Sequence, residues 1–150
     1  MTPGLRVAHA VSDEDVCACL PVLRELRPHL GDEAACLAQI RRQGRQGYQL
    51  LALWRGAGVV ACAGHRVTET LIRGRFFYVD DLVTTSAERS QGLGERLMEA
   101  LIAAAREQAC HALVLDSGVD NVGAHRFYLR QGLDIRAFRF ARALEPLFAR

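Results

Sequence analysis

The sequence predicts an α/β fold in a single domain, with a central mixed but mostly antiparallel β-sheet flanked by helices. Three observations lead to this prediction. The chain has 150 residues, of which 50% are hydrophobic, and this length suits one globular domain with a sizeable core. Two apolar runs in the first half are joined by a tight turn, which favours an antiparallel hairpin. The second half alternates strand-like and helix-like segments, which favours an α/β crossover.

The N-terminal segment predicts one strand followed by two helices. Residues 5–8 are apolar and β-prone, and Ser12 is suited to cap a helix whose first turn is acidic. That helix is expected to run toward Arg27, with Pro21 kinking or splitting it. Residues 32–42 have apolar side chains at helical spacing and predict the second helix.

The middle of the chain predicts strands. Residues 48–54 and 59–67 are apolar and β-prone, and Gly56 and Gly58 lie in the turn between them. This hairpin is expected to bring antiparallel pairing to the sheet. A polar loop then leads to a further strand-like run over residues 76–84.

The most regular helix pattern follows this run. Leucine or alanine recurs at positions 93, 97, 101 and 105, which predicts a helix over residues 92–108 with one buried face. Residues 112–115 are typical of a short buried strand. Residues 121–130 predict another helix, and residues 133–140 predict the last strand.

Charge and hydrophobicity exclude several classes of function. The formal net charge is +2, which supplies no broad basic surface and argues against nucleic-acid binding. The longest apolar runs fall well short of the roughly 20 residues that span a bilayer, and the N-terminus is charged where a signal peptide would be apolar. We therefore expect a cytoplasmic protein that binds small molecules and neither nucleic acid nor a membrane.

The cysteines predict neither a disulfide framework nor a metal site. Their number is odd, five, and no Cys-x-x-Cys pair occurs, so the pattern favours buried and unreactive thiols. A nucleophilic cysteine would need a nearby base, and the only local candidates are His65 after Cys62 and His111 after Cys110. Both histidines lie at expected strand ends, where packing accounts for them equally well.

A glycine-rich turn before the long helix is the first candidate binding site. Its sequence is Arg89-Ser90-Gln91-Gly92-Leu93-Gly94. Glycines let backbone N–H groups approach an anion, and a helix N-terminus adds a partial positive charge. The turn lacks the Gly-Lys-Ser/Thr of a nucleoside-triphosphate loop, and Leu97 stands where the dinucleotide fingerprint has its third glycine. The turn therefore predicts a phosphate site, with a simple helix cap as the alternative.

Arg89-x-x-Gly92-x-Gly94 resembles the pyrophosphate-binding motif of the GNAT superfamily of N-acetyltransferases. Further along, Asn121-x-x-Ala124-x-x-Phe127-Tyr128-x-x-x-Gly132-Leu133 resembles the second signature of that family, in the right order and separation. The chain departs from the family at Thr84-Thr85-Ser86, which replaces Val-x-Pro, and at Ser90, where a glycine often follows the arginine. The resemblance implies a GNAT-like fold.

The same resemblance implies acetyl-CoA as the cosubstrate. Its pyrophosphate is expected at the backbone N–H groups from Gln91 to Glu95, with Arg89 as a charged contact. Its pantetheine arm is expected beside the strand that ends near Thr84, paired with the backbone as an added strand would be. The cofactor-binding residues so implied are Leu82, Val83, Thr84, Arg89, Ser90, Gln91, Gly92, Leu93, Gly94, Glu95, Asn121 and Phe127.

Tyr128 is the candidate general acid. A phenol with a pKa of about 10 stays protonated at neutral pH, and it can protonate a departing thiolate whose thiol has a pKa of about 8.5. Packing beside Phe127 is the structural alternative for Tyr128. Asn121 is expected on the same helix face, where it either hydrogen-bonds the cofactor or caps its helix. His125 is given no role.

Asp80 and Asp81 stand in the middle of an apolar run, where carboxylates are costly unless they are paired or functional. One expectation is a salt bridge to Arg73, Arg75 or another basic side chain. The other is recognition of an amine and relay of its proton through water, because some family members that accept cationic amines are acidic here. Strand alternation sends the two side chains to opposite faces, so only one, with Asp81 favoured, is expected in the cleft unless a bulge intervenes.

These residues predict an N-acetyltransferase that moves acetyl from acetyl-CoA to a primary amine by direct attack through a tetrahedral intermediate. Residues to about 74 are expected on the acceptor side, and about 75–141 on the acetyl-CoA side. The alternative is a non-catalytic acyl-CoA binding or sensing module. A hydrolase using Ser117 and His125 is disfavoured, because Ser117 lacks the glycines of a nucleophile elbow. Family members often form dimers, so a homodimer is a further expectation.

Overall fold

The computed structural model describes residues 4–89 and 91–145. They form two compact units, the first ending at Leu115 and the second beginning at Asp116. The described elements of the first unit are β1 (Leu5–Ala10), α1 (Asp13–Leu26), α2 (Glu33–Gly44), β2 (Gln49–Arg55), β3 (Gly58–Thr70), β4 (Gly74–Thr84), the 3₁₀ helix η1 (Ser86–Glu88), α3 (Leu93–Glu107) and β5 (Leu113–Leu115). The second unit holds α4 (Val122–Arg130).

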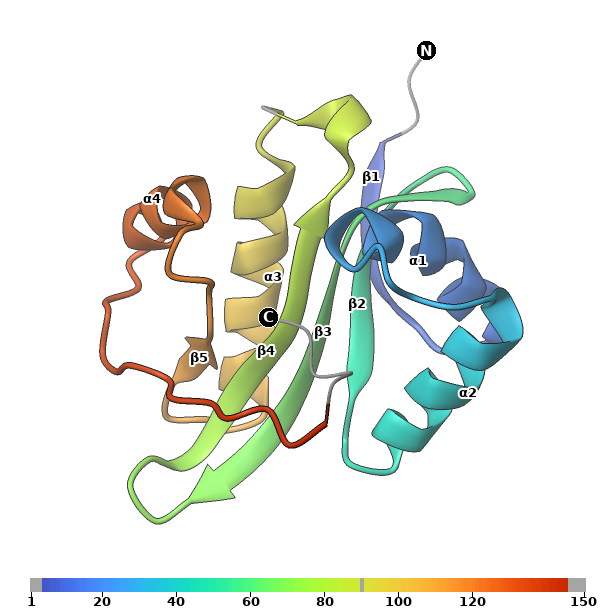
Figure 1. The fold of residues 1–150 in the computed structure, drawn as a ribbon. Coiled ribbons are helices and arrows are strands. Elements are labelled where there is room, and N and C mark those ends of the chain that lie inside the picture. The colour runs from blue at the N-terminus through green and yellow to red at the C-terminus, as the bar shows by residue number, and fades with distance from the viewer. Residues whose placement is uncertain (1–3, 90, 146–150) are drawn as a thin grey trace. The chain divides into compact units, whose positions relative to one another are not determined.

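The first unit is built on a five-stranded sheet with the order β1-β2-β3-β4-β5 (Figure 1). Neighbouring strands from β1 to β4 pair antiparallel, and β5 pairs parallel to β4. The predicted mixed and mostly antiparallel sheet is therefore confirmed, as is the hairpin of β2 and β3. A second, longer hairpin joins β3 to β4, and its strands extend several residues beyond the apolar runs that predicted them.

Helices cover both faces of this sheet. α1 and α2 lie against one face and α3 against the other (Figure 1). Each face has its own apolar cluster, because alternate residues of a central strand point to opposite sides. The cluster under α1 and α2 includes Val16, Cys19, Leu20, Leu50, Trp54 and Cys62, and the cluster under α3 includes Leu51, Leu53, Phe77, Leu97 and Leu101.

The first two helices begin where the sequence predicts. The side chain of Ser12 caps α1 and that of Asp32 caps α2, each by accepting a hydrogen bond from a backbone N–H in the first turn. The alternative that Pro21 splits α1 is wrong, because the helix runs unbroken past it. Burial of Leu20 and Leu23 on either side of the proline supplies packing energy that offsets the missing backbone hydrogen bond.

The strand predicted over residues 133–140 is wrong. This segment has no regular secondary structure, and Ile135, Phe138 and Phe140 are 74%, 82% and 93% exposed. β-prone residues form a strand only where a neighbouring strand pairs with them. The described part of the second unit contains no strand that could do so.

Candidate functional site

A bulge in β4 places the two adjacent carboxylates. Val79 lies opposite His65 of β3 and Asp81 lies opposite Gly64, so Asp80 is an extra residue in the β4 ladder. Both carboxylates contact side chains that gather around the ring of Tyr48. This bulge is the exception that the sequence left open, and it cancels the alternation that would send Asp80 and Asp81 to opposite faces of a regular strand.

Each carboxylate is paired with an arginine. Arg66 of β3 donates from Nε and Nη2 to the two oxygens of Asp80, at 3.0 and 2.9 Å. Arg27, which follows α1, donates from Nε to Asp81 Oδ1 at 3.1 Å and from Nη2 to the Asp80 carbonyl oxygen at 3.1 Å. The hydroxyl of Tyr48 donates to Asp81 Oδ2 at 2.7 Å. We call these five residues, Arg27, Tyr48, Arg66, Asp80 and Asp81, the carboxylate cluster.

Burial shifts the pKa values of two members of this cluster, Asp80 and Tyr48. Partial burial raises the pKa of Asp80, and its hydrogen bonds with Arg66 act in the opposite direction. Burial and the neighbouring Asp81 carboxylate raise the pKa of Tyr48 well above its ordinary value, so its hydroxyl stays protonated and donates. The predicted salt bridges thus form, but with Arg27 and Arg66. Of the arginines named from the sequence, Arg73 lies over the ring of Phe76 and Arg75 donates to the Gln108 carbonyl oxygen.

Replacing Gly64 with alanine is expected to lower the free energy of unfolding by about 1 to 3 kcal/mol. A Cβ atom at Gly64 would stand 2.0 Å from the Tyr48 hydroxyl oxygen, so the ring would have to move away from Asp81. Urea unfolding measures the effect. The control is Gly44→Ala at the end of α2, where a Cβ atom meets nothing within 4 Å. Equal unfolding curves for Gly64→Ala and the wild type would contradict this position of Tyr48.

β4 has an open edge beyond its bulge. The pairing of β4 with β5 ends at Val79 and Leu115, whereas its pairing with β3 continues to Thr84. Leu82, Val83 and Thr84, three of the predicted cofactor contacts, lie on this stretch. Within the described part of the first unit no strand covers its outer edge, so an extended ligand can hydrogen-bond there.

The turn after β4 leads into an uncapped helix N-terminus. Gly92 is the N-cap of α3 and has a φ of 74°, a left-handed conformation that glycine adopts without strain. The first backbone hydrogen bond of the helix runs from the Arg96 N–H to the Gly92 carbonyl oxygen, at 3.1 Å. The N–H groups of the three residues before Arg96 therefore have no partner within the helix. Gln91 and Glu95 are exposed there. Ser90, also predicted as a contact, lies outside the described residues.

Side chains from other elements hold the loop between β4 and α3. Glu25 of α1 accepts hydrogen bonds from the Ser86 backbone N–H at 2.8 Å and from the Thr85 hydroxyl at 2.9 Å. The bond from the Ser86 N–H is the main reason why the pKa of Glu25 is lowered. Glu88 of η1 pairs with Arg55 of β2 at 2.8 Å. The loop that carries Arg89 is thus anchored at both ends of η1.

The second unit carries the remaining predicted residues. Asn121 is the N-cap of α4, but its side chain makes no capping hydrogen bond, which removes the capping explanation for this residue. The rings of Phe127 and Tyr128 meet edge to face with centres 5.7 Å apart. His125 Nε2 lies 2.7 Å from the Gly118 carbonyl oxygen, so this imidazole holds the preceding loop.

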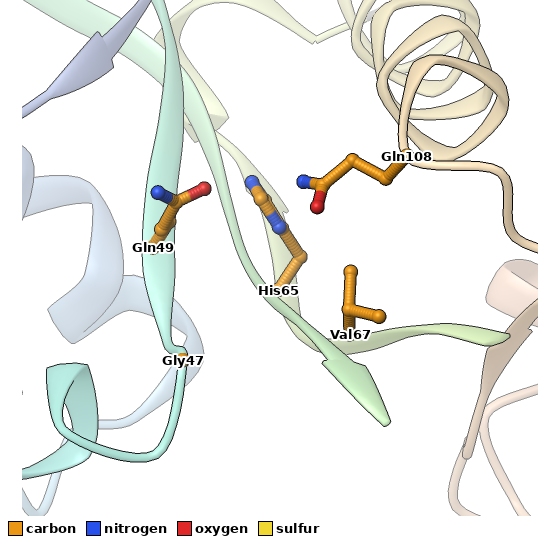
Figure 2. Close-up of a pocket in the computed structure, with 5 residues that line it drawn as sticks. All are labelled: Gly47, Gln49, His65, Val67 and Gln108. Carbon is orange, nitrogen blue, oxygen red and sulfur yellow. The ribbon is translucent and has the colours of Figure 1, made fainter. Parts of the chain in front are cut away.

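A pair of histidines on the α3 side of the sheet was not predicted as a unit. The Nε2 atoms of His9 and His65 lie 3.0 Å apart, and the His65 ring stacks on Phe77 with centres 4.5 Å apart. His65 also borders a pocket of about 240 Å³, between the side chains of Gln49 and Gln108 (Figure 2). Cys62 belongs to the cluster under α1 and α2, so His65 is not its base.

The free energy of unfolding is expected to fall by about 2 kcal/mol between pH 7 and pH 5 on account of His65. Burial, with His9 beside it, lowers the pKa of His65 from 6.5 to about 4. Between these values the unfolded chain binds more protons than the folded chain, so acid favours unfolding. Urea unfolding at pH 7 and pH 5 measures the change in the free energy of unfolding between the two pH values. This change should be smaller for His65→Gln than for the wild type, and it should equal that of the wild type for His29→Gln, which replaces an exposed histidine. An unchanged difference for His65→Gln would contradict this assignment.

The cysteines and the acidic residues give no sign of a metal centre. All five cysteines are free thiols, and the hydrogen bond with Cys19, together with burial, raises the pKa of Cys62. In residues 4–89 and 91–145 no three His, Cys, Asp or Glu side chains are placed to hold a metal ion. None of the described helices has the length and apolar character to cross a membrane.

Several residues of the carboxylate cluster escaped the sequence analysis. Tyr48 and Arg66 were predicted only as parts of strands, and Arg27 only as a helix end. The fold brings them to the two carboxylates from distant parts of the sequence: Arg27 and Asp81 are 54 positions apart, and Tyr48 and Asp81 are 33 apart. The sequence signal was limited to the carboxylates themselves.

Comparisons with known proteins give a consistent result. A model of the acetyltransferase (GNAT) family matches residues 14–133. The uncharacterized N-acetyltransferase YhdJ of Bacillus subtilis (strain 168) is 28% identical over 137 residues, covering 91% of this chain and 96% of that protein. Glucosamine 6-phosphate N-acetyltransferase 1 of Oryza sativa subsp. japonica is 32% identical over 120 residues, covering 75% of this chain and 71% of that protein.

Solved structures of N-acetyltransferases have a similar fold. The aminoglycoside N-acetyltransferase AAC(6')-Iy in complex with CoA superposes with a TM-score of 0.79 at 12% identity, covering 96% of this chain and 97% of that one. At this identity the likeness concerns the fold alone.

Proposed function

The chain belongs to the acetyltransferase (GNAT) family and is thus an acetyl-CoA-dependent acetyltransferase, and we propose that it acetylates a primary amine. Direct attack of the amine nitrogen on the thioester forms a tetrahedral intermediate. The named substrates of two relatives, glucosamine 6-phosphate and aminoglycosides, both carry amino groups. The proposal includes a cytoplasmic location and a homodimer, both of which stay predictions.

The unpaired edge of β4 is the observation that supports the proposed position of acetyl-CoA. The open edge of β4 runs through Leu82 to Thr84 and leads directly into the turn before α3. A pantetheine arm, which has amide donors and acceptors, can pair with that edge as a strand would. The diphosphate then reaches the unpaired N–H groups that follow Gly92, with Arg89 as its charged contact. Asn121 and Phe127, which the family resemblance implies as cofactor contacts, stay predicted contacts.

A protonated amine loses two protons in all, one before its nitrogen attacks and one afterwards, and the sulfur gains one. A carboxylate of the carboxylate cluster takes the first proton through a water molecule, because most of a free amine is protonated at neutral pH. The neutral nitrogen then forms a bond to the carbonyl carbon. The nitrogen of the tetrahedral intermediate loses the second proton to water, and the carbon–sulfur bond breaks with its electron pair on sulfur. The hydroxyl of Tyr128 gives its proton to that thiolate and regains a proton from water. In this proposal residues to about 74 supply most of the acceptor side and about 75–141 the acetyl-CoA side.

Asp80 and Asp81 are expected to respond differently to replacement by asparagine. Asp81→Asn is expected to lower turnover by about 10- to 100-fold and to flatten its pH dependence, since the amide keeps the acceptor for Tyr48 but cannot take a proton. Asp80→Asn is expected to lower the melting temperature more than the turnover, because it breaks a two-point contact with Arg66 that is only 22% exposed on the Asp80 side. If both variants had the turnover of the wild type from pH 6 to 9, the two carboxylates would have a structural role and no role in catalysis.

Release of the CoA thiol tests the proposed activity. The protein is incubated with acetyl-CoA alone and then with each of several primary amines, and the free thiol is measured over time. We expect release to depend on the amine. Binding of acetyl-CoA without amine-dependent release would instead identify a non-catalytic acyl-CoA module.

A further inference from the structure

Charge balance within the carboxylate cluster bears on which amines it accepts. Two carboxylates stand against two guanidinium groups, and each carboxylate already has an arginine within 3.1 Å. Arginine stays charged at every pH at which proteins are stable, so both guanidinium groups keep their positive charge throughout the working range. A polycation would have to displace a guanidinium group from a carboxylate and would meet two positive charges on approach. The cluster therefore does not favour a polycationic acceptor.

The two arginines differ in how many of their guanidinium nitrogens already donate a hydrogen bond. Arg66 is 18% exposed and uses Nε and Nη2 on Asp80 and Nη1 on Gln46 Oε1, at 3.2 Å. All of its nitrogens are therefore occupied. Arg27 is 42% exposed and uses only Nε and Nη2. Among the hydrogen bonds of the described residues, none involves its Nη1, so this half-exposed guanidinium group has one nitrogen that can still donate beside Asp81.

We propose that Arg27 binds an anionic group of the acceptor, which is then a primary amine that also carries a phosphate or a carboxylate. This inference rests on the proposed function, because it takes the carboxylate cluster as the acceptor site. The Asp81 carboxylate, itself held by the Tyr48 hydroxyl, and the Asp80 carbonyl oxygen hold the guanidinium group of Arg27 in place, so little side-chain entropy is lost when the anion docks. Arg27 is thus a specificity-determining residue, and the amine lies within reach of the carboxylate that Arg27 also contacts.

Matched pairs of amines test the inference. Glucosamine 6-phosphate is compared with glucosamine, and β-alanine with propylamine, so that one arm adds a phosphate and the other a carboxylate. Spermidine serves as the polycation. We expect kcat/KM to be about 10- to 100-fold higher for the anionic member of at least one pair. The arm that shows the preference identifies the anion.

Variants of Arg27 connect the preference to that residue. Arg27→Gln should abolish the preference and improve relative use of spermidine, because it leaves Asp81 without its cation. Arg27→Lys keeps the charge and should retain part of the preference. Arg42→Gln, which removes an exposed arginine of α2, is the control for net charge and should retain all of it. Equal kcat/KM within both pairs, or a preference that survives Arg27→Gln, would overturn the inference.

A binding measurement separates this inference from the proposed function. Titration of glucosamine 6-phosphate and of β-alanine into the CoA-bound protein is followed by calorimetry for the wild type and Arg27→Gln. Binding that depends on Arg27, without any acetyl transfer, would support the anion site and contradict the proposed activity. Acetyl transfer to amines with no dependence of binding on Arg27 would do the reverse. No binding of either anion to the wild type would overturn the inference.

Discussion

Replacement of Gly92 with valine is expected to abolish stabilisation of the protein by acetyl-CoA. For the wild type, ligand at about 100 times its dissociation constant should add roughly 2.7 kcal/mol, which corresponds to about 5 to 10 °C in melting temperature. Gly92 has a φ of 74°, which a β-branched residue does not tolerate, so valine would rotate the N–H groups at the start of α3 away from the diphosphate. Thermal unfolding with and without acetyl-CoA measures the shift.

The unliganded Gly92→Val protein should still fold, because Gly92 is exposed and a Cβ atom there meets nothing within 4 Å. Gly92→Asn is the matched control, since asparagine tolerates the left-handed region better than other residues. It should keep most of the ligand-induced shift. A full shift in Gly92→Val would show that the cosubstrate binds elsewhere.

Tyr128→Phe is expected to lower turnover by about 10- to 10³-fold while leaving the acetyl-CoA-induced shift intact. The change removes one hydroxyl and keeps the ring, so the edge-to-face contact with Phe127 can remain. Loss of a proton donor affects the departing thiolate and not the bound ground state. Steady-state rates at saturating acetyl-CoA, with the thermal shift as the control for binding, measure the effect. Equal turnover in the two proteins would return Tyr128 to a packing role.

The elements that depend on local pattern were predictable from the sequence. α3 was expected over residues 92–108 and spans Leu93–Glu107, because its apolar face repeats at the helical period and Gly92 marks its start. The β2–β3 hairpin follows equally from its glycine turn. The segment 133–140 has the same kind of local β signal, but a strand also needs a partner edge. That requirement depends on tertiary structure, so composition could not supply it.

The candidate site likewise contains residues that a local motif predicts and residues that only the fold brings together. Gly92 and its turn were found because the motif is contiguous, and the helix N-terminus accounts for its chemistry. The bulge at Asp80 was considered only as an exception, because no residue type in the run 76–84 marks it. Arg66 reaches Asp80 through the register of β3 with β4. Arg27 reaches Asp81 from the end of α1, and Tyr48 reaches it from the residue before β2. Contacts between residues so far apart in the sequence leave no pattern in any one segment of it.

Mass spectrometry of the amine product shows directly whether the protein transfers acetyl to an amine. Acetyl-CoA with an isotopically labelled acetyl group is incubated with the wild-type protein and a panel of amino sugars, their phosphates, amino acids, polyamines and peptides. We predict that at least one primary amine gains the labelled acetyl group on nitrogen, with one CoA thiol released for each amide formed. The same product should be absent with Gly92→Val. Stabilisation of the protein by acetyl-CoA with no labelled amine, and with thiol release that no amine changes, would show that the protein binds acetyl-CoA without acetylating amines.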